Sequence, residues 1–324
     1  MKNSPIIFCH YGNSKYLPYV FKCAKISNPN AEIILLGDDS NLEVARSCGI
    51  SHFQLKDYDF GEELKKFDQL YELISTPSFD GFKHGEDWNK FVFRKWLMLD
   101  NFLRQHQIER FWHFDSDNMI FTDLSTLEHK YLHLDCTVQC MGKCMKGFFS
   151  NREIIERYNE KINEVFARKD FIAQVKKEMS KESGPSCFNE MNVYEIFQQE
   201  ENFKYLRLSA ISDNSSFDDL ICRPDGMKMH KLPLGEDSKI VYMNLDGRFF
   251  CIEEATNKPI EMHALNLSWI PIYIFAGILK HFKKYHGKPH QNLSPKAKTL
   301  AQIPIPLKQK LKFLRKSLKK KFKG

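Results

Sequence analysis

Short apolar runs alternate with amphipathic segments over the first 55 residues of the chain. The apolar runs cover residues 5–10, 31–36 and 51–55, and the segments between them, 16–26 and 42–48, carry apolar residues at helical spacing. Each run ends in a polar or glycine-containing turn, which is typical of a buried strand that leads into a loop. The alternation predicts an α/β fold with a mostly parallel sheet flanked by helices.

Longer elements are expected farther along the chain. Four segments predict helices, over residues 64–74, 89–104, 153–181 and 189–200. The aromatic run Arg110 to Phe114 predicts a buried strand, residues 137–141 predict another, and residues 204–251 predict short strands and turns. We expect three parts in the chain: a domain over residues 1–270, a connecting segment over 271–302 and a tail over 303–324.

Composition narrows the class of protein. Apolar residues make up 42% of the 324 residues and charged residues 27%, which is typical of a folded globular chain. The nine cysteines are odd in number and favour free thiols in a reducing compartment over a disulfide framework. No secretory signal peptide is visible, and the longest nearly uncharged apolar run, residues 265–279, is shorter than the stretch of about 20 residues that a membrane-spanning helix needs. A cytoplasmic location is therefore expected.

Charge is unevenly distributed along the chain. There are 48 Lys and Arg against 41 Asp and Glu, and 15 of the basic residues follow Glu261, the last acidic residue. The first 261 residues therefore have a net charge of −8, although the whole chain has a net charge of +7. The overall basic charge is no evidence for a nucleic-acid partner, because the folded body is mildly acidic.

The basic residues of the tail are combined with an apolar stripe. Five apolar residues recur three or four positions apart, at Leu307, Leu311, Leu314, Leu318 and Phe322, and residues 307–324 also contain nine Lys and Arg. Such a helix over residues 307–324 suits an anionic membrane surface, so we expect peripheral association with the inner face of a membrane. A nucleic-acid partner is not expected, because aromatic residues that could stack on bases are sparse. A solvated tail without stable structure is the alternative.

Two carboxylates follow the aromatic strand. In an extended chain the side chains of Asp115 and Asp117 point the same way, so they repel each other unless a cation or hydrogen-bond donors lie between them. Carboxylate oxygens suit magnesium or manganese, which keep open positions for phosphate groups. The pattern favours a metal-dependent site for a phosphorylated ligand, although a surface turn with two solvated aspartates would carry the same residues.

The order of these segments resembles a known family. A strand that leads into a loop at residues 6–13, a second strand that ends at residues 37–39, and an aromatic strand that closes on Asp115-Ser116-Asp117 are similar to the GT-A fold glycosyltransferases. The resemblance covers about residues 4–270 and rests on order and spacing. It implies a Rossmann-type sheet, a nucleoside diphosphate sugar donor and a manganese or magnesium ion at the Asp-x-Asp motif.

The resemblance also implies roles at the metal site. Asp117 would bind the cation that bridges the donor diphosphate, and Asp115 would contact the same metal or the ribose. His263 would complete the metal site from the C-terminal half of the chain. The sequence departs from the frequent family pattern that follows this histidine, because Asn266 stands in place of a glycine and Trp269 in place of a phosphate-binding lysine.

Donor contacts follow from the same resemblance. Four residues of the first loop would touch the nucleoside: His10, Tyr11, Gly12 and Asn13. Asp38 would contact the base or ribose, and Arg94 would lie near the donor phosphates. In the helix that starts near residue 189, Glu190 and then Asn189 are the candidates to face the sugar and acceptor, although both residues could be helix caps.

Two further groups of residues are candidates, one for metal binding and one for contact with the acceptor. Cys136, Cys140 and Cys144 are spaced by four, which lacks the paired spacing of zinc or iron–sulfur sites and favours free thiols. Residues 141–143 and 146–147 are expected to line the acceptor side of the cleft.

We therefore expect a metal-dependent glycosyltransferase that moves a sugar to a hydroxyl of a glycan or lipid-linked acceptor, as in polysaccharide biosynthesis. A phosphatase of the haloacid-dehalogenase type is the alternative enzyme, with Asp115 as nucleophile and Asp218-Asp219 as a late acidic pair. A catalytically inactive, membrane-bound scaffold is the alternative without chemistry.

Overall fold

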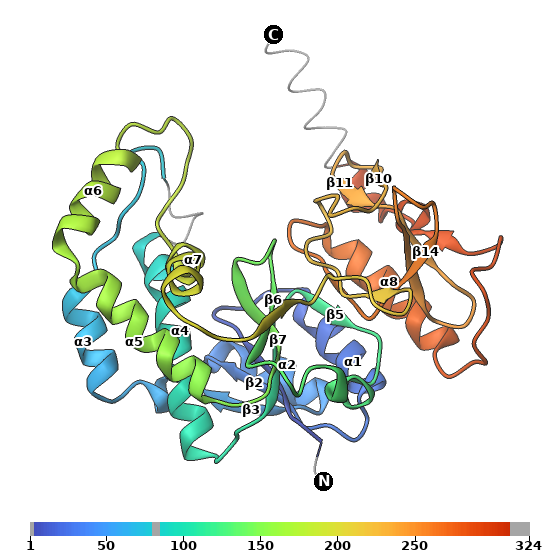
Figure 1. Ribbon diagram of the computed structural model, residues 1–324. Helices are drawn as coiled ribbons and strands as arrows, with labels where there is room; N and C mark the ends of the chain where they lie inside the picture. Colours follow the sequence, from blue (N-terminus) through green and yellow to red (C-terminus); the bar gives the residue numbers. More distant parts are fainter. Residues whose placement is uncertain (1–2, 80–84, 312–324) are drawn as a thin grey trace.

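A seven-stranded sheet forms the centre of the computed structural model, which describes residues 3–79 and 85–311 (Figure 1). The strand order is β3-β2-β1-β4-β7-β6-β8. Its strands are β1 (Ile6–Cys9), β2 (Ile33–Gly37), β3 (Ser51–Gln54), β4 (Phe111–Asp115), β6 (Cys136–Gln139), β7 (Cys144–Phe149) and β8 (Tyr205–Arg207). Strands β1 to β4 run parallel, and β7 runs antiparallel to its neighbours β4 and β6. The expected mostly parallel α/β sheet is confirmed.

Helices cover both faces of this sheet, because the strand residues alternate between two hydrophobic cores. Ile6 and Phe8 of β1 face one core, and Ile7 and Cys9 face the other. The first core also holds buried side chains of α1 (Leu17–Ser27), α2 (Leu42–Cys48) and α8 (Ile272–Tyr285). The second holds those of α3 (Glu62–Leu70), α4 (Gly85–Gln105), α5 (Glu153–Ala167), α6 (Lys169–Met179) and α7 (Glu190–Glu200).

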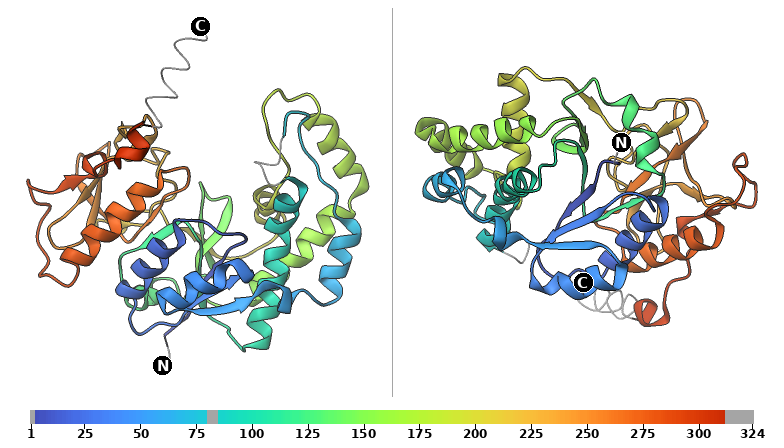
Figure 2. Two further views of the ribbon diagram at one scale, coloured as in Figure 1. Left: turned by 180° about the vertical axis from the view of Figure 1, so that it is seen from behind. Right: turned by 90° about the horizontal axis from the view of Figure 1, so that it is seen from below.

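The C-terminal region adds a smaller five-stranded sheet with the order β16-β12-β13-β14-β9. Its strands are β9 (Ser215–Ser216), β12 (Val241–Met243), β13 (Phe249–Ile252), β14 (Pro259–Met262) and β16 (Lys298–Thr299). Two strand pairs accompany it: β10 (Met229–Lys231) with β11 (Asp237–Lys239), and β5 (Asn118–Ile120) with β15 (Ala264–Asn266). Figure 2 shows this region and the helices α3 to α7 on opposite sides of the β6–β7 hairpin.

Residues 271–302 do more than connect two parts of the chain. They hold α8 and β16, and α8 packs on α1, with the rings of Tyr16 and Phe275 stacked at a centroid distance of 5.2 Å. Gly277 lies so close to Ile303 that an added Cβ would stand 2.4 Å from Ile303 Cγ2. The packed body therefore continues to about residue 303, beyond the expected boundary at 270.

Two expectations for the helices and strands were wrong. The single helix expected over residues 153–181 is broken at Arg168, where ψ is 78° and the guanidinium pairs with Glu164 and Glu200. Strand β7 was not among the expected elements, and Lys146 and Gly147, expected to line the cleft, belong to this buried strand. The tail expected to bind membranes lies mostly outside the described residues; residues 307–311 are helical, and Leu307 and Leu311 are exposed. None of the helices in the described part of the chain has the length and apolar character to span a bilayer.

Candidate functional site

The carboxyl ends of three neighbouring parallel strands bring the candidate residues to one edge of the sheet. Strand β1 lies between β2 and β4, and Cys9 is paired with both Leu36 and Asp115. His10 therefore follows β1 beside Asp115, and Asp38 follows β2 on the other side. In open α/β sheets, ligands bind in the crevice outside these strand ends.

Asp115 lies between two buried lysines. Lys146 Nζ is 2.6 Å from Asp115 Oδ1 and Lys95 Nζ is 3.6 Å from it, while the two lysine side chains are only 1% and 9% exposed. Burial by itself would raise the pKa of Asp115, but the two ammonium groups outweigh it and hold the pKa well below its usual range. Asp115 is therefore ionised at neutral pH.

Asp117 has the opposite electrostatic environment. Burial, followed by the negative charge of Asp115, raises the pKa of Asp117 to about 6. A hydrogen bond of 2.6 Å from the Ser268 hydroxyl to Asp117 Oδ2 only partly offsets this. Asp117 therefore carries an ionised carboxylate at neutral pH that the surrounding protein does not fully stabilise.

Glu190 is joined to the aspartate pair through Lys95. Lys95 Nζ is 3.7 Å from Glu190 Oε1, and burial raises the pKa of Glu190 although the ammonium group of Lys95 opposes the shift. Asn189 is the N-cap of α7, and its side-chain oxygen accepts a hydrogen bond of 2.9 Å from the backbone N–H of Met191. The structure thus brings Glu190 into the site and gives Asn189 the capping role that was its alternative.

His10 is buried next to the segment that carries the two aspartates. Its Nδ1 lies 2.7 Å from the hydroxyl oxygen of Ser116, between the two aspartates, and its Nε2 is buried without a hydrogen-bond partner among the described residues. Burial lowers the pKa of His10 to about 4, so the imidazole is neutral at pH 7. The next residues of the loop lie farther out: Gly12 N donates to Asp38 Oδ2 at 2.5 Å, and Asn13 is exposed.

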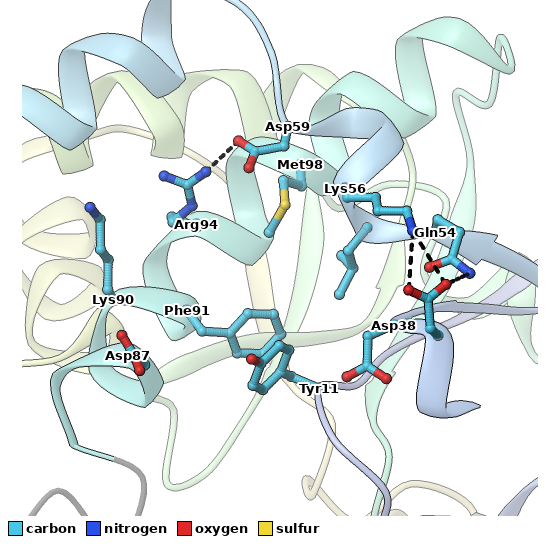
Figure 3. A pocket seen from close by; sticks show the side chains of 13 residues that line it. Tyr11, Asp38, Gln54, Lys56, Asp59, Asp87, Lys90, Phe91, Arg94 and Met98 are labelled. Atoms are coloured by element: carbon cyan, nitrogen blue, oxygen red, sulfur yellow. Dashed lines mark hydrogen bonds and ion pairs between the residues drawn. The ribbon is translucent and has the colours of Figure 1, made fainter. Parts of the chain in front are cut away.

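A pocket of about 420 Å³ lies beside the site, over the ends of β1, β2 and β3 (Figure 3). Its lining includes Tyr11, Gly37, Asp38, Asp39, Gln54, Leu55, Lys56, Asp59, Asp87, Lys90, Phe91, Arg94 and Met98. The exposed ring of Tyr11 lies 5.3 Å from that of Phe91, between their centroids. A pocket with an aromatic wall and several polar groups has the character of a small-molecule site.

Arg94 lies on the pocket side of α4 and not beside the aspartate pair. Its guanidinium lines the pocket but forms ion pairs with Asp59 and Asp68. Neighbouring residues of a helix point in different directions, and it is the next residue, Lys95, that reaches Asp115. The α4 cation beside the aspartate pair is therefore Lys95.

His263 also lies elsewhere than expected. The register of β15 on β5 pairs Asn266 with Asn118, and Phe121 N donates to His263 O, so His263 lies several residues away from Asp117 along the ladder. Its Nδ1 is 3.0 Å from Thr122 Oγ1, and burial lowers its pKa to about 4. The residue that reaches Asp117 from this segment is Ser268. The expected third metal ligand is thus not at the site.

Over residues 3–79 and 85–311, the structure contains no group of three or more His, Cys, Asp or Glu side chains arranged to hold a metal. The nine cysteines, including Cys136, Cys140 and Cys144, are free thiols. An ion at this site would therefore have carboxylates from Asp115 and Asp117 as its protein ligands.

Sequence reasoning missed Lys95 and Ser268 as members of the site, and it expected Lys146 on the acceptor side of the cleft without its pairing with Asp115. A signal for Lys146 was present, because a lysine within the apolar run 144–149 is rarely buried unless it is paired with an acid. Lys95 and Ser268 had no such signal, since a lysine on an amphipathic helix and a serine in a loop are ordinarily exposed to solvent. Their roles depend on tertiary contacts.

Comparisons with known proteins give only distant likenesses. No family model matches the chain, and no curated protein matches it. Among solved structures, the PaToxG glycosyltransferase is 12% identical with a TM-score of 0.35, over 61% of this chain and 70% of that one. The glycosyltransferase GlyE of Streptococcus pneumoniae TIGR4 is 13% identical with a TM-score of 0.31, over 64% of this chain and 45% of that one.

A third similar structure is a cytidylyltransferase from Leptospira borgpetersenii serovar Hardjo-bovis (strain JB197). It is 10% identical with a TM-score of 0.30, over 61% of this chain and 94% of that one. At these TM-scores, the likenesses carry no argument about the activity of this chain. The proposal below rests on the site itself.

Proposed function

We propose that this protein is a GT-A-like glycosyltransferase that takes its sugar from a nucleoside diphosphate sugar. The observation that carries the proposal is the position of Asp115 and Asp117. They lie at the carboxyl end of a parallel sheet, between a pocket with an aromatic wall and two buried lysines. In this arrangement Tyr11 and Asp38 contact the nucleoside, and the diphosphate extends toward the aspartates.

The aspartate pair fits a magnesium or manganese ion. Burial, followed by the nearby negative charge of Asp115, raises the pKa of Asp117, and a divalent cation between the two carboxylates would relieve their repulsion. Magnesium commonly uses one or two carboxylates together with waters and substrate phosphates, so a third protein ligand is not required. When bound, the ion offsets the negative charge of the leaving diphosphate.

The buried residues have separate tasks in this proposal. Lys146 and Lys95 hold Asp115 ionised, so it is ready to bind a cation. Lys95 also positions Glu190, whose carboxylate accepts the proton of the acceptor hydroxyl or stabilises the sugar as the donor bond breaks. The neutral His10 fixes the loop between the aspartates through Ser116.

Calorimetry tests the metal and nucleotide roles together. Wild type is titrated with UDP, GDP and CDP, with and without manganese, beside Asp117→Asn and the control Asp170→Asn at an exposed position of α6. We expect one nucleotide to bind in a manganese-dependent manner, and Asp117→Asn to weaken that binding at least about tenfold, as expected for the loss of a metal ligand. Equal heats for wild type and Asp117→Asn would contradict the assignment.

Diphosphate release from a panel of nucleotide sugars tests the reaction. Turnover of a nucleotide sugar supports the transferase, whereas release of phosphate from p-nitrophenyl phosphate supports the haloacid-dehalogenase alternative. Absence of any manganese-dependent nucleotide binding would favour the inactive scaffold.

The same proposal places the acceptor near a membrane. Leu307 and Leu311, four residues apart in a helix, are 72% and 49% exposed, and they begin the apolar stripe of residues 307–324. We propose that this stripe and its lysines bind an anionic membrane surface, where glycan or lipid-linked acceptors are available.

A further inference from the structure

Two large apolar side chains are exposed close to the aspartate pair. Met141 is 50% exposed in the turn between β6 and β7, and Trp269 is 76% exposed directly after Ser268, whose hydroxyl binds Asp117. Single exposed apolar residues are common on protein surfaces. These two differ from most because of the backbone conformation that presents them.

Both side chains are held by a backbone that bulky residues rarely adopt. Met141 has φ of +61° between Cys140 at +54° and Gly142 at +82°, and Trp269 has φ of +67°. Left-handed conformations are unfavourable for such residues and persist only where neighbouring contacts enforce them. They are also typical of residues at functional sites.

One buried acidic pair, Asp218-Asp219, fixes the β6–β7 turn. Asp219 Oδ2 accepts a hydrogen bond from Met141 N, and the carbonyl oxygen of Asp218 accepts one of 3.0 Å from Gln139 Nε2. Asp218 is fully buried and its carboxylate lies 2.5 Å from Lys239 Nζ, which balances its charge. The turn is therefore held at Gln139 and at Met141.

The same pair fixes the loop that carries Trp269. Asn266 N donates to Asp218 Oδ2 at 3.0 Å, and Asn266 Nδ2 donates to the carbonyl oxygen of Asp219 at 3.0 Å. Asn266 Oδ1 in turn accepts from Ser268 N at 3.2 Å and lies 2.7 Å from the Ser268 hydroxyl oxygen, so it shares the one hydroxyl proton with Asp117. Met141 and Trp269 are thus presented by two loops that share one support.

The strand order places the β6–β7 turn with Met141 on the far side of the aspartates from the nucleoside pocket, and Trp269 lies near the aspartates through Ser268, which binds Asp117. That pocket lies over β1, β2 and β3, Asp115 ends β4, and β7 and β6 come next along the sheet. Figure 1 shows the β6–β7 hairpin standing between the helices α6 and α7 and the C-terminal strands. With the donor nucleoside in the pocket, the hairpin side of the site is left for the acceptor.

We propose that Met141 and Trp269 form the two apolar walls of an acceptor subsite that takes a pyranose ring, so the acceptor is a carbohydrate. This inference rests on the proposed glycosyltransferase function and adds the acceptor class. A sugar ring has an apolar C–H face and a rim of hydroxyls, so it suits apolar walls surrounded by polar groups. Polar groups are present here: Lys143 is paired with Glu195, and Arg207 with Asp219. A lipid chain would instead require a continuous apolar lining.

The test compares Trp269→Ala, Trp269→Phe and Met141→Ala with the control Phe60→Ala, which removes a half-exposed aromatic far along the chain. The probes are methyl and p-nitrophenyl hexopyranosides, supplied with the nucleotide sugar that wild type turns over. We expect Trp269→Ala and Met141→Ala to raise the KM for the hexoside about tenfold and the KM for the donor much less. The KM of Trp269→Phe for the hexoside is expected to stay much closer to that of wild type, and Phe60→Ala is expected to behave as wild type.

Fluorescence gives a second measurement that does not depend on turnover. Hexosides should change the tryptophan emission of wild type, and this change should be absent in Trp269→Phe. Trp96 and Trp112 are buried, and Trp88 lies on α4 between Asp87 and the other residues that line the nucleoside pocket. The inference is overturned if no hexoside raises turnover or changes emission, or if the hexoside KM of both alanine variants stays within twofold of wild type. Failure of every donor to turn over would instead overturn the proposed function.

Asp219 is a positioning residue in this proposal. Asp219→Asn keeps an oxygen for Met141 N and should leave the hexoside KM close to that of wild type. Asp219→Ala removes the support and should raise the hexoside KM more than the donor KM, provided that circular dichroism shows a folded protein. Equal effects of both variants on the two KM values would show that Asp219 does not position the subsite.

Discussion

At the scale of single residues, the site combines a stabilised carboxylate with an unstabilised one. Asp115 is paired with two buried ammonium groups, whereas Asp117, two residues later, has its pKa raised to about 6 by burial and by Asp115. Groups that function in ligand binding are often unfavourable for stability. Asp117 fits this description, which leads to a prediction about stability and pH.

Asp117→Asn should stabilise the metal-free protein at neutral pH. The ordinary pKa of this carboxyl in an unfolded chain is 3.8, and its pKa in the folded protein is about 6. The free energy of unfolding therefore falls as the pH rises between these two values, and it stays at the lower value at higher pH. The melting temperature of Asp117→Asn at pH 7 is expected to exceed that of wild type by a few degrees. Below pH 4 the two should melt together. A lower melting temperature for the variant at pH 7 would contradict the raised pKa.

Lys146→Met should destabilise the protein. Removing one partner of a buried pair leaves an unpaired charge, and we expect a loss of about 3 kcal/mol in the free energy of unfolding, at the low end of the usual range because Asp115 keeps partial exposure. Urea unfolding measures the loss. The exposed Lys66→Met on α3 is the control and should change stability little. Equal stability of the two variants would mean that the ion pair is unimportant.

At the scale of helices and strands, the sequence predicted an element best where the signals within its own segment agreed. Strands β1 to β4 and helices α1, α2 and α4 were predictable, because apolar periodicity and turn residues agree in them. The break at Arg168 and the buried strand β7 were not predictable, since both depend on partners distant in sequence: Glu200 for Arg168, and Asp115 for Lys146. The same reason explains the site, where Asp115 and Asp117 followed from the motif but Lys95, Lys146 and Ser268 did not.

Strand β7 also contains a glycine that its packing requires. Gly147 has φ of +94°, and an added Cβ would lie 2.4 Å from Thr137 Oγ1 and 2.6 Å from Leu208 Cδ2. Gly147→Ala should therefore lower the free energy of unfolding by about 3 kcal/mol, from the left-handed backbone and from overpacking. Gly184→Ala is a matched control, because nothing lies within 4 Å of its added Cβ. Chemical denaturation of both variants checks this, and a tolerated Gly147→Ala would show that β7 can shift.

At the scale of the whole molecule, charge separates the folded body from the tail. Residues 1–303 have a net charge of −2, whereas residues 304–324 carry nine Lys and Arg and no Asp or Glu. An anionic surface would therefore attract the tail and not the body, which would orient the protein on a membrane.

Vesicle flotation tests this orientation. The full chain should float with phosphatidylserine vesicles at low salt and release at high salt, and it should not float with phosphatidylcholine alone. Replacing Lys319, Lys320 and Lys321 with Glu should abolish binding. The control replaces Lys169, Lys177 and Lys181, exposed residues on and beside α6, and should bind as wild type. Loss of binding in both variants would indicate a general charge effect instead of a tail interaction.

The packing of α8 on α1 has a consequence for how the protein is made. The helix α1 leaves the ribosome early, but the surface that covers its outer side, around Phe275, is synthesised only near the end of the chain. At typical rates of synthesis the nascent N-terminal half waits roughly tens of seconds with an apolar face open to the cell interior. Chaperones that hold nascent chains are therefore expected to contact this protein during translation, and a ribosome stalled before residue 272 would display a half that cannot complete its core.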